Sequence, residues 1–408
     1  MRKWQCAFVC AALTAVVLLS MTGKLTRSVY HNEGPALYRS SRDCQQAISD
    51  KSPLQLTYEW YAHALHEQHT NYECEQLRTP NGESVWTSEE EQRFPIAYAI
   101  AAYESFTRLA RLLRMIHRNH NVYCIHVDAK APKDFVRKVK YLAQCFGSNV
   151  ILVADEQRVD VRWGYFSVLQ STLICSELLL KNELVDWRYM LNINEKEFPL
   201  RTNWELVSSL KALNGSNMVE GIPGDKFSDR FPNSNFSFKF SWVKGSFLVA
   251  LRREFVQFIH TDKRALEILS AMKAESHIRK VQDELFFSTL AYNPHLGAPG
   301  ACSKLHPITY QDPRSWFLAR YVNWDEKHCP SKLAVHWLCI LGMRDLPILV
   351  RQPHLFANKF LPHFEPEAYT CMEYWYWKKV HNERIRRVLD PSFNKSLYSQ
   401  LYCTQEHI

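Results

Sequence analysis

Short apolar runs alternate with amphipathic stretches from about residue 94 onward, and this alternation predicts most of the fold. Stretches with apolar residues at helical spacing separate the runs, and Ser105 is a candidate N-cap for the first of them. Such alternation predicts a mainly parallel sheet with helices on both faces, which binds its ligands at the carboxyl ends of the strands. The expected strands are 94–102, 121–127, 149–154 and 187–193, and the expected helices are 105–118, 132–146, one within 164–182, and 204–213.

The first residues carry a different pattern. Residues 5 to 21 form an apolar run broken by Thr14 and Ser20, and Arg2 and Lys3 precede it. A spanning helix needs about 20 residues and a signal-peptide core about 7 to 15, so both interpretations stay open. As an anchor, the run would leave the N-terminus in the cytosol by the positive-inside rule. Either interpretation places the remainder of the chain in the lumen of the secretory pathway.

Cysteines and glycosylation sequons agree with a lumenal protein. The chain has twelve cysteines, and disulfides persist in the secretory pathway but are rare in the cytosol. No Cys-x-x-Cys pair occurs, which argues against a structural zinc module. The net charge of +8 is scattered along the chain, so we interpret it as solvated surface rather than a nucleic-acid site. The sequons are Asn214-Gly-Ser, Asn235-Phe-Ser and Asn394-Lys-Ser.

Missing motifs narrow the chemistry. The chain has no GxGxxG after its first strand and no GxxxxGK[ST], which disfavours dinucleotide and phosphate-loop chemistry. It also has no Asp-x-Asp, the motif by which many nucleotide-sugar transferases hold a divalent cation on the pyrophosphate. Asp128 ends the strand 121–127 and could hold a ribose or a base, although many strands end in Asp for capping reasons.

One segment near the C-terminus resembles a known family. His354-Leu355-Phe356-Ala357-Asn358-Lys359-Phe360, together with 335–342 upstream, is similar to the signature of the core 2 type β-1,6-N-acetylglucosaminyltransferases of glycosyltransferase family 14. The similarity covers roughly residues 94–371 and includes Trp163 and Gly245-Ser246. It implies a GT-A-like α/β nucleotide-sugar transferase fold with UDP-N-acetylglucosamine as donor. It also implies that the enzyme uses no divalent metal and no other cofactor.

The resemblance assigns roles on the donor side. Family members neutralise the donor diphosphate with a lysine and an arginine; Lys359 matches the lysine, whereas His336 stands in the arginine position. Because histidine lacks the planar guanidinium and is mostly neutral at pH 7, Arg344 is a candidate substitute, or else an ordinary loop residue. Glu284 matches the catalytic glutamate, which takes a proton from the attacking hydroxyl, although an acidic first helical turn also suits the helix dipole. Asp128 would contact the uridine part of the donor.

The acceptor side departs further from the family pattern. Glu220 and Trp324 match residues that contact the acceptor sugar, but Glu326 replaces a tyrosine near Trp324. Leu248 replaces another tyrosine, and the run 195–199, Glu-Lys-Glu-Phe-Pro, departs from Gly-x-Asp-Phe-Pro. These departures concern the identity of the acceptor rather than the class of donor.

The resemblance also implies a disulfide pattern, which the sequence alone does not fix. Cys302 and Cys403 have no counterpart in the family and are either free or paired with each other. The implied pairs are Cys44 with Cys371, Cys74 with Cys145, Cys124 with Cys175, and Cys329 with Cys339.

Together these features predict a single-pass type II Golgi membrane protein with a lumenal catalytic domain. It would transfer N-acetylglucosamine to carbon 6 of N-acetylgalactosamine in O-glycans of glycoproteins, would not bind nucleic acid, and could form a homo-oligomer. One alternative is a weak or inactive transferase-like protein that binds glycan or nucleotide, which His336 and Glu326 favour. A second is a xylosyltransferase-like enzyme, which Trp163-Gly164 favours. The predicted parts are a cytosolic tail (1–4), a transmembrane signal-anchor (5–22), a lumenal stem (23–93), the catalytic domain (94–385) and a C-terminal tail (386–408).

Overall fold

A computed structural model describes residues 41–48, 73–78 and 86–408. The predicted cytosolic tail and signal-anchor lie outside these residues. No helix within the described ranges is long and apolar enough to cross a membrane.

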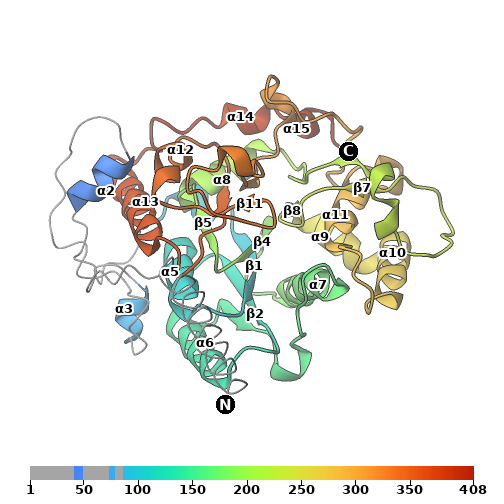
Figure 1. Cartoon of the computed structure of the whole chain (residues 1–408), viewed down its shortest axis with the longest axis horizontal. Helices are drawn as coiled ribbons and strands as arrows, with labels where there is room; N and C mark the ends of the chain where they lie inside the picture. Colours follow the sequence, from blue (N-terminus) through green and yellow to red (C-terminus); the bar gives the residue numbers. More distant parts are fainter. Residues whose placement is uncertain (1–40, 49–72, 79–85) are drawn as a thin grey trace, which may run out of the picture. The chain divides into compact units, whose positions relative to one another are not determined.

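A five-stranded sheet forms the centre of the fold (Figure 1). Its strand order is β3-β2-β1-β4-β8, and only β8 runs antiparallel to its neighbour, so the predicted mainly parallel sheet is confirmed. The chain proceeds outward from β1 to β2 and β3, and then returns to the other side of β1 for β4. The space between the carboxyl ends of β1 and β4 is therefore the switch point where such sheets bind ligands. The strands are β1 (Ile96–Ala102), β2 (Val122–Val127), β3 (Val150–Leu152), β4 (Tyr189–Asn194) and β8 (Ala250–Arg252).

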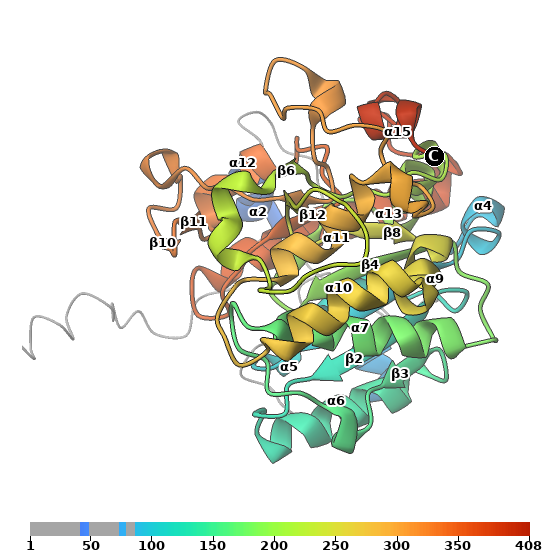
Figure 2. The same cartoon turned by 90° about the vertical axis from the view of Figure 1, so that its right-hand side faces the viewer.

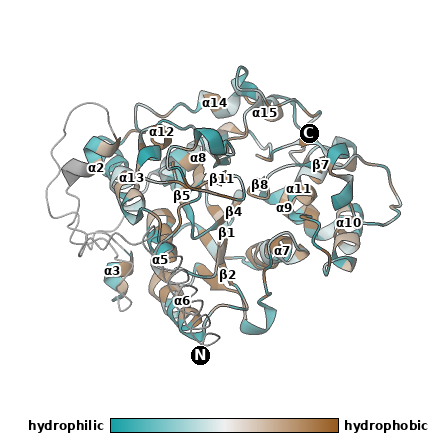
Figure 3. Cartoon of the chain, viewed as in Figure 1, coloured by the Kyte–Doolittle hydropathy of each residue, from teal (hydrophilic) through white to brown (hydrophobic). Residues whose placement is uncertain are grey.

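Helices cover both faces of this sheet, as the alternating pattern predicted (Figures 1 and 2). Successive residues of a strand point to opposite faces. Ile96, Tyr98 and Ile100 accordingly join the core under the helices α5 and α6, whereas Ala97 and Ala99 join the core under α7, α9, α10 and α11. The central strands are correspondingly apolar (Figure 3). The helices are α5 (Phe106–Ile116), α6 (Lys133–Phe146), α7 (Phe166–Lys181), α9 (Arg253–Thr261), α10 (Lys263–Ala274) and α11 (Asp283–Ala291).

Helix α5 is buried more completely than its sequence pattern predicted. Ser105 caps it as predicted, since its side chain accepts the N–H of Arg108 at 3.3 Å. The pattern predicted one buried face, but every residue of α5 is buried. The long helix α13 (Pro366–Arg386) supplies Glu373, which forms ion pairs with Arg111 and Arg114 at 2.6 and 2.5 Å. Burial of the polar face therefore depends on a helix more than 250 residues away in the sequence.

Shorter elements complete the structure. Three small sheets have the orders β5-β12-β9, β6-β7 and β10-β11, and the described residues also form seven further α-helices and six 3₁₀ helices. The strands are β5 (Glu197–Pro199), β6 (Ile222–Pro223), β7 (Val243–Lys244), β9 (Arg320–Tyr321), β10 (Ala334–Val335), β11 (Leu338–Cys339) and β12 (Phe356–Asn358). The α-helices are α2 (Ser41–Ile48), α3 (Cys74–Arg78), α4 (Glu89–Gln92), α8 (Asn203–Ala212), α12 (Leu346–Leu349), α14 (Ser396–Ser399) and α15 (Tyr402–Glu406), and 3₁₀ turns include η6 (Glu326–His328) and η7 (Met343–Asp345).

Disulfides tie the outer segments to this core. Cys44 and Leu77 of the predicted stem are buried in the core, as is Tyr398 of the predicted C-terminal tail. The described parts of the predicted stem and tail therefore pack against the predicted catalytic domain. The disulfides are Cys44–Cys371, Cys74–Cys145, Cys124–Cys175 and Cys329–Cys339, the four pairs that the resemblance implies, and Cys302–Cys403.

Candidate functional site

Asp128, a candidate residue for binding the sugar donor, lies at the carboxyl edge of the central sheet. Asp128 directly follows β2, and its backbone N–H donates to the carbonyl of Ala102 at 2.9 Å. One carboxylate oxygen accepts the backbone N–H of Lys130 at 2.8 Å, and the other lies 3.1 Å from the Lys130 ammonium. These contacts stabilise a turn at the end of β2. Asp128 therefore has the structural role at the strand end that the sequence offered as an alternative to ligand binding.

Glu195 joins the loops that follow β1 and β4. Its carboxylate is fully buried and accepts the backbone N–H groups of Tyr103 and Glu104 at 3.2 and 3.1 Å. Burial raises the pKa of Glu195 to about 7, although the two backbone donors and the nearby Lys196 oppose that shift. The carboxylate therefore fixes the two loops that border the switch point.

Lys359 follows β12 and is half-buried. Burial lowers the pKa of its ammonium, Lys196 lowers it further, and Glu104 opposes both effects. Within the part of the chain that the structure describes, the Lys359 ammonium forms no ion pair. It is thus a partly desolvated cation available to an anionic ligand.

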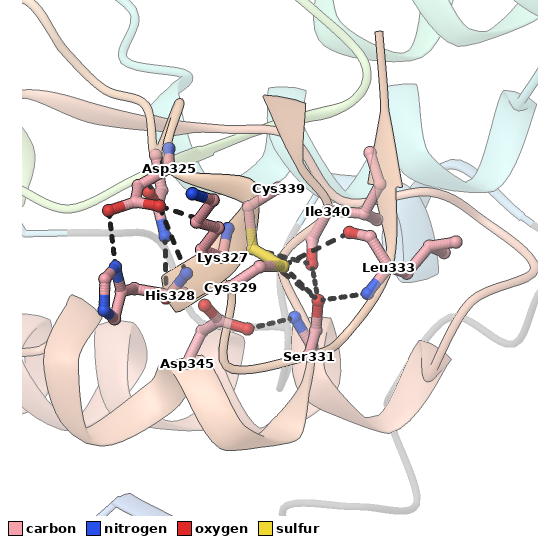
Figure 4. Close-up of a disulfide and its surroundings, with 11 residues drawn as sticks. Asp325, Lys327, His328, Cys329, Ser331, Leu333, Cys339, Ile340 and Asp345 are labelled. Carbon is pink, nitrogen blue, oxygen red and sulfur yellow. Dashed lines mark hydrogen bonds and ion pairs between the residues drawn. A yellow bond between two sulfur atoms is a disulfide. The ribbon is translucent and has the colours of Figure 1, made fainter. Parts of the chain in front are cut away.

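His336 lies in the connection between β10 and β11. The disulfide Cys329–Cys339 closes the segment that contains these two strands (Figure 4). Ser331 braces the base of this loop, because its hydroxyl accepts the N–H of Leu333 and donates to the carbonyl of Ile340. His336 and Trp337 have φ angles of 52° and 64°, and consecutive non-glycine residues in this region store strain. This conformation leaves both side chains exposed.

An aromatic and cationic stack lies beside this loop. The rings of His336 and Trp163 are stacked with centroids 5.8 Å apart, and the Arg279 guanidinium carbon lies 4.3 Å from the Trp163 ring centroid. Gly164 has a φ of +79°, and a Cβ there would lie 3.0 Å from the Arg279 side chain. Glycine at this position therefore permits the close approach of Arg279 to the stack.

Glu284 lies in the first turn of α11, as predicted, among charged groups. Its Oε2 atom is 2.7 Å from the Arg230 guanidinium and 3.5 Å from the Lys244 ammonium. The side chain keeps 26% of its surface exposed, so a substrate hydroxyl can reach it. The neighbouring Asp283 is buried, and burial together with Glu284 raises its pKa to about 7. Sequence reasoning missed Arg230 and Lys244, because neither stands in a recognisable motif.

Glu220 belongs to the same group of charges. Burial raises the pKa of Glu220, Lys244 opposes the shift, and Glu284 adds to it. The backbone permits this proximity through Gly245, whose N–H donates to the carbonyl of Glu284 at 2.8 Å. A Cβ on Gly245 would lie 2.0 Å from the Glu220 carbonyl oxygen and 2.3 Å from the Ser288 hydroxyl. The structure therefore brings together the predicted base and one predicted acceptor residue.

A small hollow of about 40 Å³ opens beside Glu220. Its walls include Tyr292, Trp316 and Tyr402, and the disulfide of Cys403 fastens α15 at its edge. Aromatic rings of this kind offer apolar faces to sugars.

The remaining predicted residues lie on exposed loops. Trp324 is 63% exposed, Glu326 begins η6, and Arg344 lies exposed in η7. Among the described residues no hydrogen bond or ion pair links these side chains to Glu220 or Glu284. All three sequon asparagines, Asn214, Asn235 and Asn394, are exposed.

Comparisons with known proteins agree on one family. Residues 96–350 match the family model "Branch: Core-2/I-Branching enzyme". The beta-1,3-galactosyl-O-glycosyl-glycoprotein beta-1,6-N-acetylglucosaminyltransferase 4 of Danio rerio is 30% identical over 332 residues, covering 74% of each chain. The human N-acetyllactosaminide beta-1,6-N-acetylglucosaminyl-transferase is 33% identical over 323 residues, covering 72% of this chain and 75% of the relative.

One solved structure, that of mouse xyloside xylosyltransferase 1, aligns with 65% of this chain and 96% of its own at 12% identity. Its TM-score of 0.32 is too low to carry a conclusion. The family model and the relatives, by contrast, cover most of the chain, including Glu220 and Glu284. The protein belongs to the Core-2/I-branching enzyme family of glycosyltransferases.

Proposed function

We propose that the protein is an inverting, metal-independent β-1,6-N-acetylglucosaminyltransferase with a GT-A-like catalytic domain. It moves N-acetylglucosamine from UDP-N-acetylglucosamine to carbon 6 of N-acetylgalactosamine in O-glycans. Family membership and the names of the curated relatives support the reaction class. The observation that carries the proposal is the partly exposed carboxylate of Glu284 at the start of α11, grouped with Glu220 through Lys244.

In this mechanism Glu284 is the general base. The carbon 6 hydroxyl attacks the anomeric carbon, its proton passes to Glu284, and the bond from the anomeric carbon to the diphosphate breaks so that UDP leaves. Arg230 and Lys244 both contact Oε2, which leaves Oε1 for the acceptor hydroxyl. One carboxylate suffices, because transfer to the opposite face of the sugar inverts the anomeric centre in a single step.

The other predicted residues take supporting roles. Lys359 neutralises the departing diphosphate, with His336 or Arg344 assisting, and Asp128 lies at the strand end where the uridine would be held. Glu220, Trp324 and Glu326 would seat the acceptor. The proposed location is the Golgi membrane, in a single-pass type II orientation with the catalytic domain in the lumen.

The test uses the full-length protein in detergent with labelled UDP-N-acetylglucosamine and a core 1 acceptor, in the presence of EDTA. We expect transfer to persist in EDTA and to fall by about 10² or more in Glu284→Gln, which removes the general base. A matched control is Glu254→Gln, because Glu254 also forms an ion pair with an arginine, Arg252, at 2.8 Å. Loss of transfer in EDTA that manganese restores would overturn the metal-independent mechanism.

A second candidate is a weak or inactive transferase-like binding protein. It is favoured by His336, which lies against Trp163, and by the exposure of Trp324, which is 63%. In the same assay, UDP binding without transfer of any sugar would establish this candidate. Transfer from UDP-xylose instead would establish a xylosyltransferase.

A further inference from the structure

Two lysines lie on adjacent chain segments at the switch point of the sheet. Strand β12 runs antiparallel to β5, with Asn358 opposite Glu197, and the N–H of Phe360 donates to the carbonyl of Lys196 at 2.8 Å. Lys359 and Lys196 therefore lie just beyond the paired ends of these strands. Like charges on neighbouring strands repel each other, so this pair costs stability in the absence of an anion.

Lys196 is held in place by the loop after β1. Its ammonium lies 2.8 Å from the Glu104 carboxylate and 4.6 Å from the centre of the Tyr103 ring. The Lys196 side chain is only 11% exposed, whereas that of Glu104 is 43% exposed. Glu104 is thus the wetter partner, and water can solvate its carboxylate if the lysine moves.

The turn that carries Lys196 is rigidly built. The side-chain carbonyl of Asn194, the last residue of β4, accepts the N–H of Lys196 at 3.0 Å. The buried carboxylate of Glu195 accepts backbone N–H groups of the loop after β1, and Glu197 forms an ion pair with the buried Arg320 at 2.9 Å. Of the acidic residues in this turn and the facing loop, only Glu104 therefore offers an accessible carboxylate to the two lysines.

The balance of charge favours an anion. Two ammonium groups face one accessible carboxylate, in a partly desolvated place where parallel sheets bind their ligands. A charge-assisted contact to phosphate is stronger in such surroundings than a hydrogen bond between neutral groups.

We infer that Lys196 is the second cation of the donor site and that it binds the diphosphate together with Lys359. This inference rests on the proposed function for the identity of the ligand. When the diphosphate arrives, Lys196 exchanges the Glu104 carboxylate for a phosphate oxygen. Both lysines then neutralise the negative charge that UDP gains as it leaves, and neither forms a covalent bond.

The test measures binding of UDP, uridine and inorganic pyrophosphate to the full-length protein by calorimetry. We expect Lys196→Ala to weaken the binding of UDP and of pyrophosphate at least 10-fold and to leave the affinity for uridine unchanged, because only the phosphates contact the lysine. Lys196→Arg should restore most of the affinity. The matched control is Lys138→Ala on α6, since Lys138 is 19% exposed and pairs with the 56% exposed Asp134 at 2.6 Å.

Glu104→Gln separates ligand binding from a structural role. If Lys196 only braces the loop, Lys196→Ala and Glu104→Gln break the same contact and must both weaken UDP binding. If Lys196 binds the diphosphate, Glu104→Gln frees it and removes a competing negative charge, so UDP should bind a few-fold more tightly. Weaker binding in both variants would overturn the inference.

The outcomes also distinguish this inference from the proposed function. If Lys359→Ala weakens UDP binding but Lys196→Ala behaves like Lys138→Ala, the inference fails and the proposed function stands. If Lys196→Ala weakens pyrophosphate binding while the wild-type protein transfers no sugar, the two-lysine site stands and the proposed function fails. Binding of neither UDP nor pyrophosphate to the wild-type protein would overturn both.

Discussion

At residue 245 the side chain is a single hydrogen atom, and the arrangement around the candidate base requires it. Strand β7 ends directly before Gly245, which lies against the backbone of Glu220 and the side chain of Ser288 on α11. The same residue donates its N–H to the carbonyl of Glu284. A larger side chain would separate the strand from the helix that holds the base.

We therefore predict that Gly245→Ala lowers the stability by about 2 kcal/mol or more and abolishes transfer, because overpacking forces the backbone apart. The control is Gly297→Ala, which has a positive φ of 68° but no atom within 4 Å of the added Cβ. That variant should lose about 1 kcal/mol to backbone strain and keep its activity. Urea unfolding and the transfer assay give the comparison, and equal effects of the two substitutions would contradict the steric argument.

At the scale of elements, the packing of α13 on α5 depends on a buried carboxylate. Burial would raise the pKa of Glu373, but Arg111 and Arg114 outweigh it and hold the pKa at about 2. Both arginines are almost fully buried, so the ion pairs are shielded from solvent. Removing one partner of such a cluster leaves charge in the interior, which costs about 3 to 5 kcal/mol.

We predict that Glu373→Gln lowers the free energy of unfolding by several kcal/mol at neutral pH. Because the folded-state pKa is depressed, the stabilisation is present above the unfolded value of about 4.3 and is lost as the pH falls through about 2. The difference in the free energy of unfolding between wild type and variant should therefore be constant above about pH 5 and should shrink as the pH falls toward 2. Urea unfolding across this range tests it, and a pH-independent difference would exclude the ionised carboxylate as the cause.

At the scale of the whole chain, disulfides connect segments that are distant in sequence. Cys302–Cys403 closes 101 residues and fastens α15 beside the hollow at Glu220, whereas Cys329–Cys339 closes only 10. In the chain-entropy model these loops correspond to stabilisation of about 5 and about 3 kcal/mol.

We predict that replacing Cys302 and Cys403 by serine destabilises the protein by about 2 kcal/mol more than replacing Cys329 and Cys339. Amide exchange should also become faster in residues 396–408 in the first double variant and not in the second. Thermal unfolding and hydrogen exchange of both variants provide the measurement. Unchanged exchange in the C-terminal residues would mean that packing alone holds α15 in place.

The sequence predicted a large part of the fold because its signals are local. Apolar runs and helical spacing located β1 to β4 and α5 to α8 to within a few residues, since each depends on neighbours along the chain. Family motifs singled out Glu284, Glu220 and Lys359, and the implied connectivity agrees with four of the five disulfides. The roles of these three residues remain predictions.

Only the tertiary structure decided which charges meet. Arg230 reaches Glu284 across 54 residues, and Glu373 reaches Arg111 across 262, distances over which no periodicity carries information. The same holds for Lys196, which the sequence showed only as part of a departure from the family pattern. Its place beside Lys359 follows from the pairing of β5 with β12, and this pairing exists because tertiary packing brings strands about 160 residues apart into register. The sequence thus determined the elements and the family, whereas the electrostatic surroundings of each site residue were set by long-range packing.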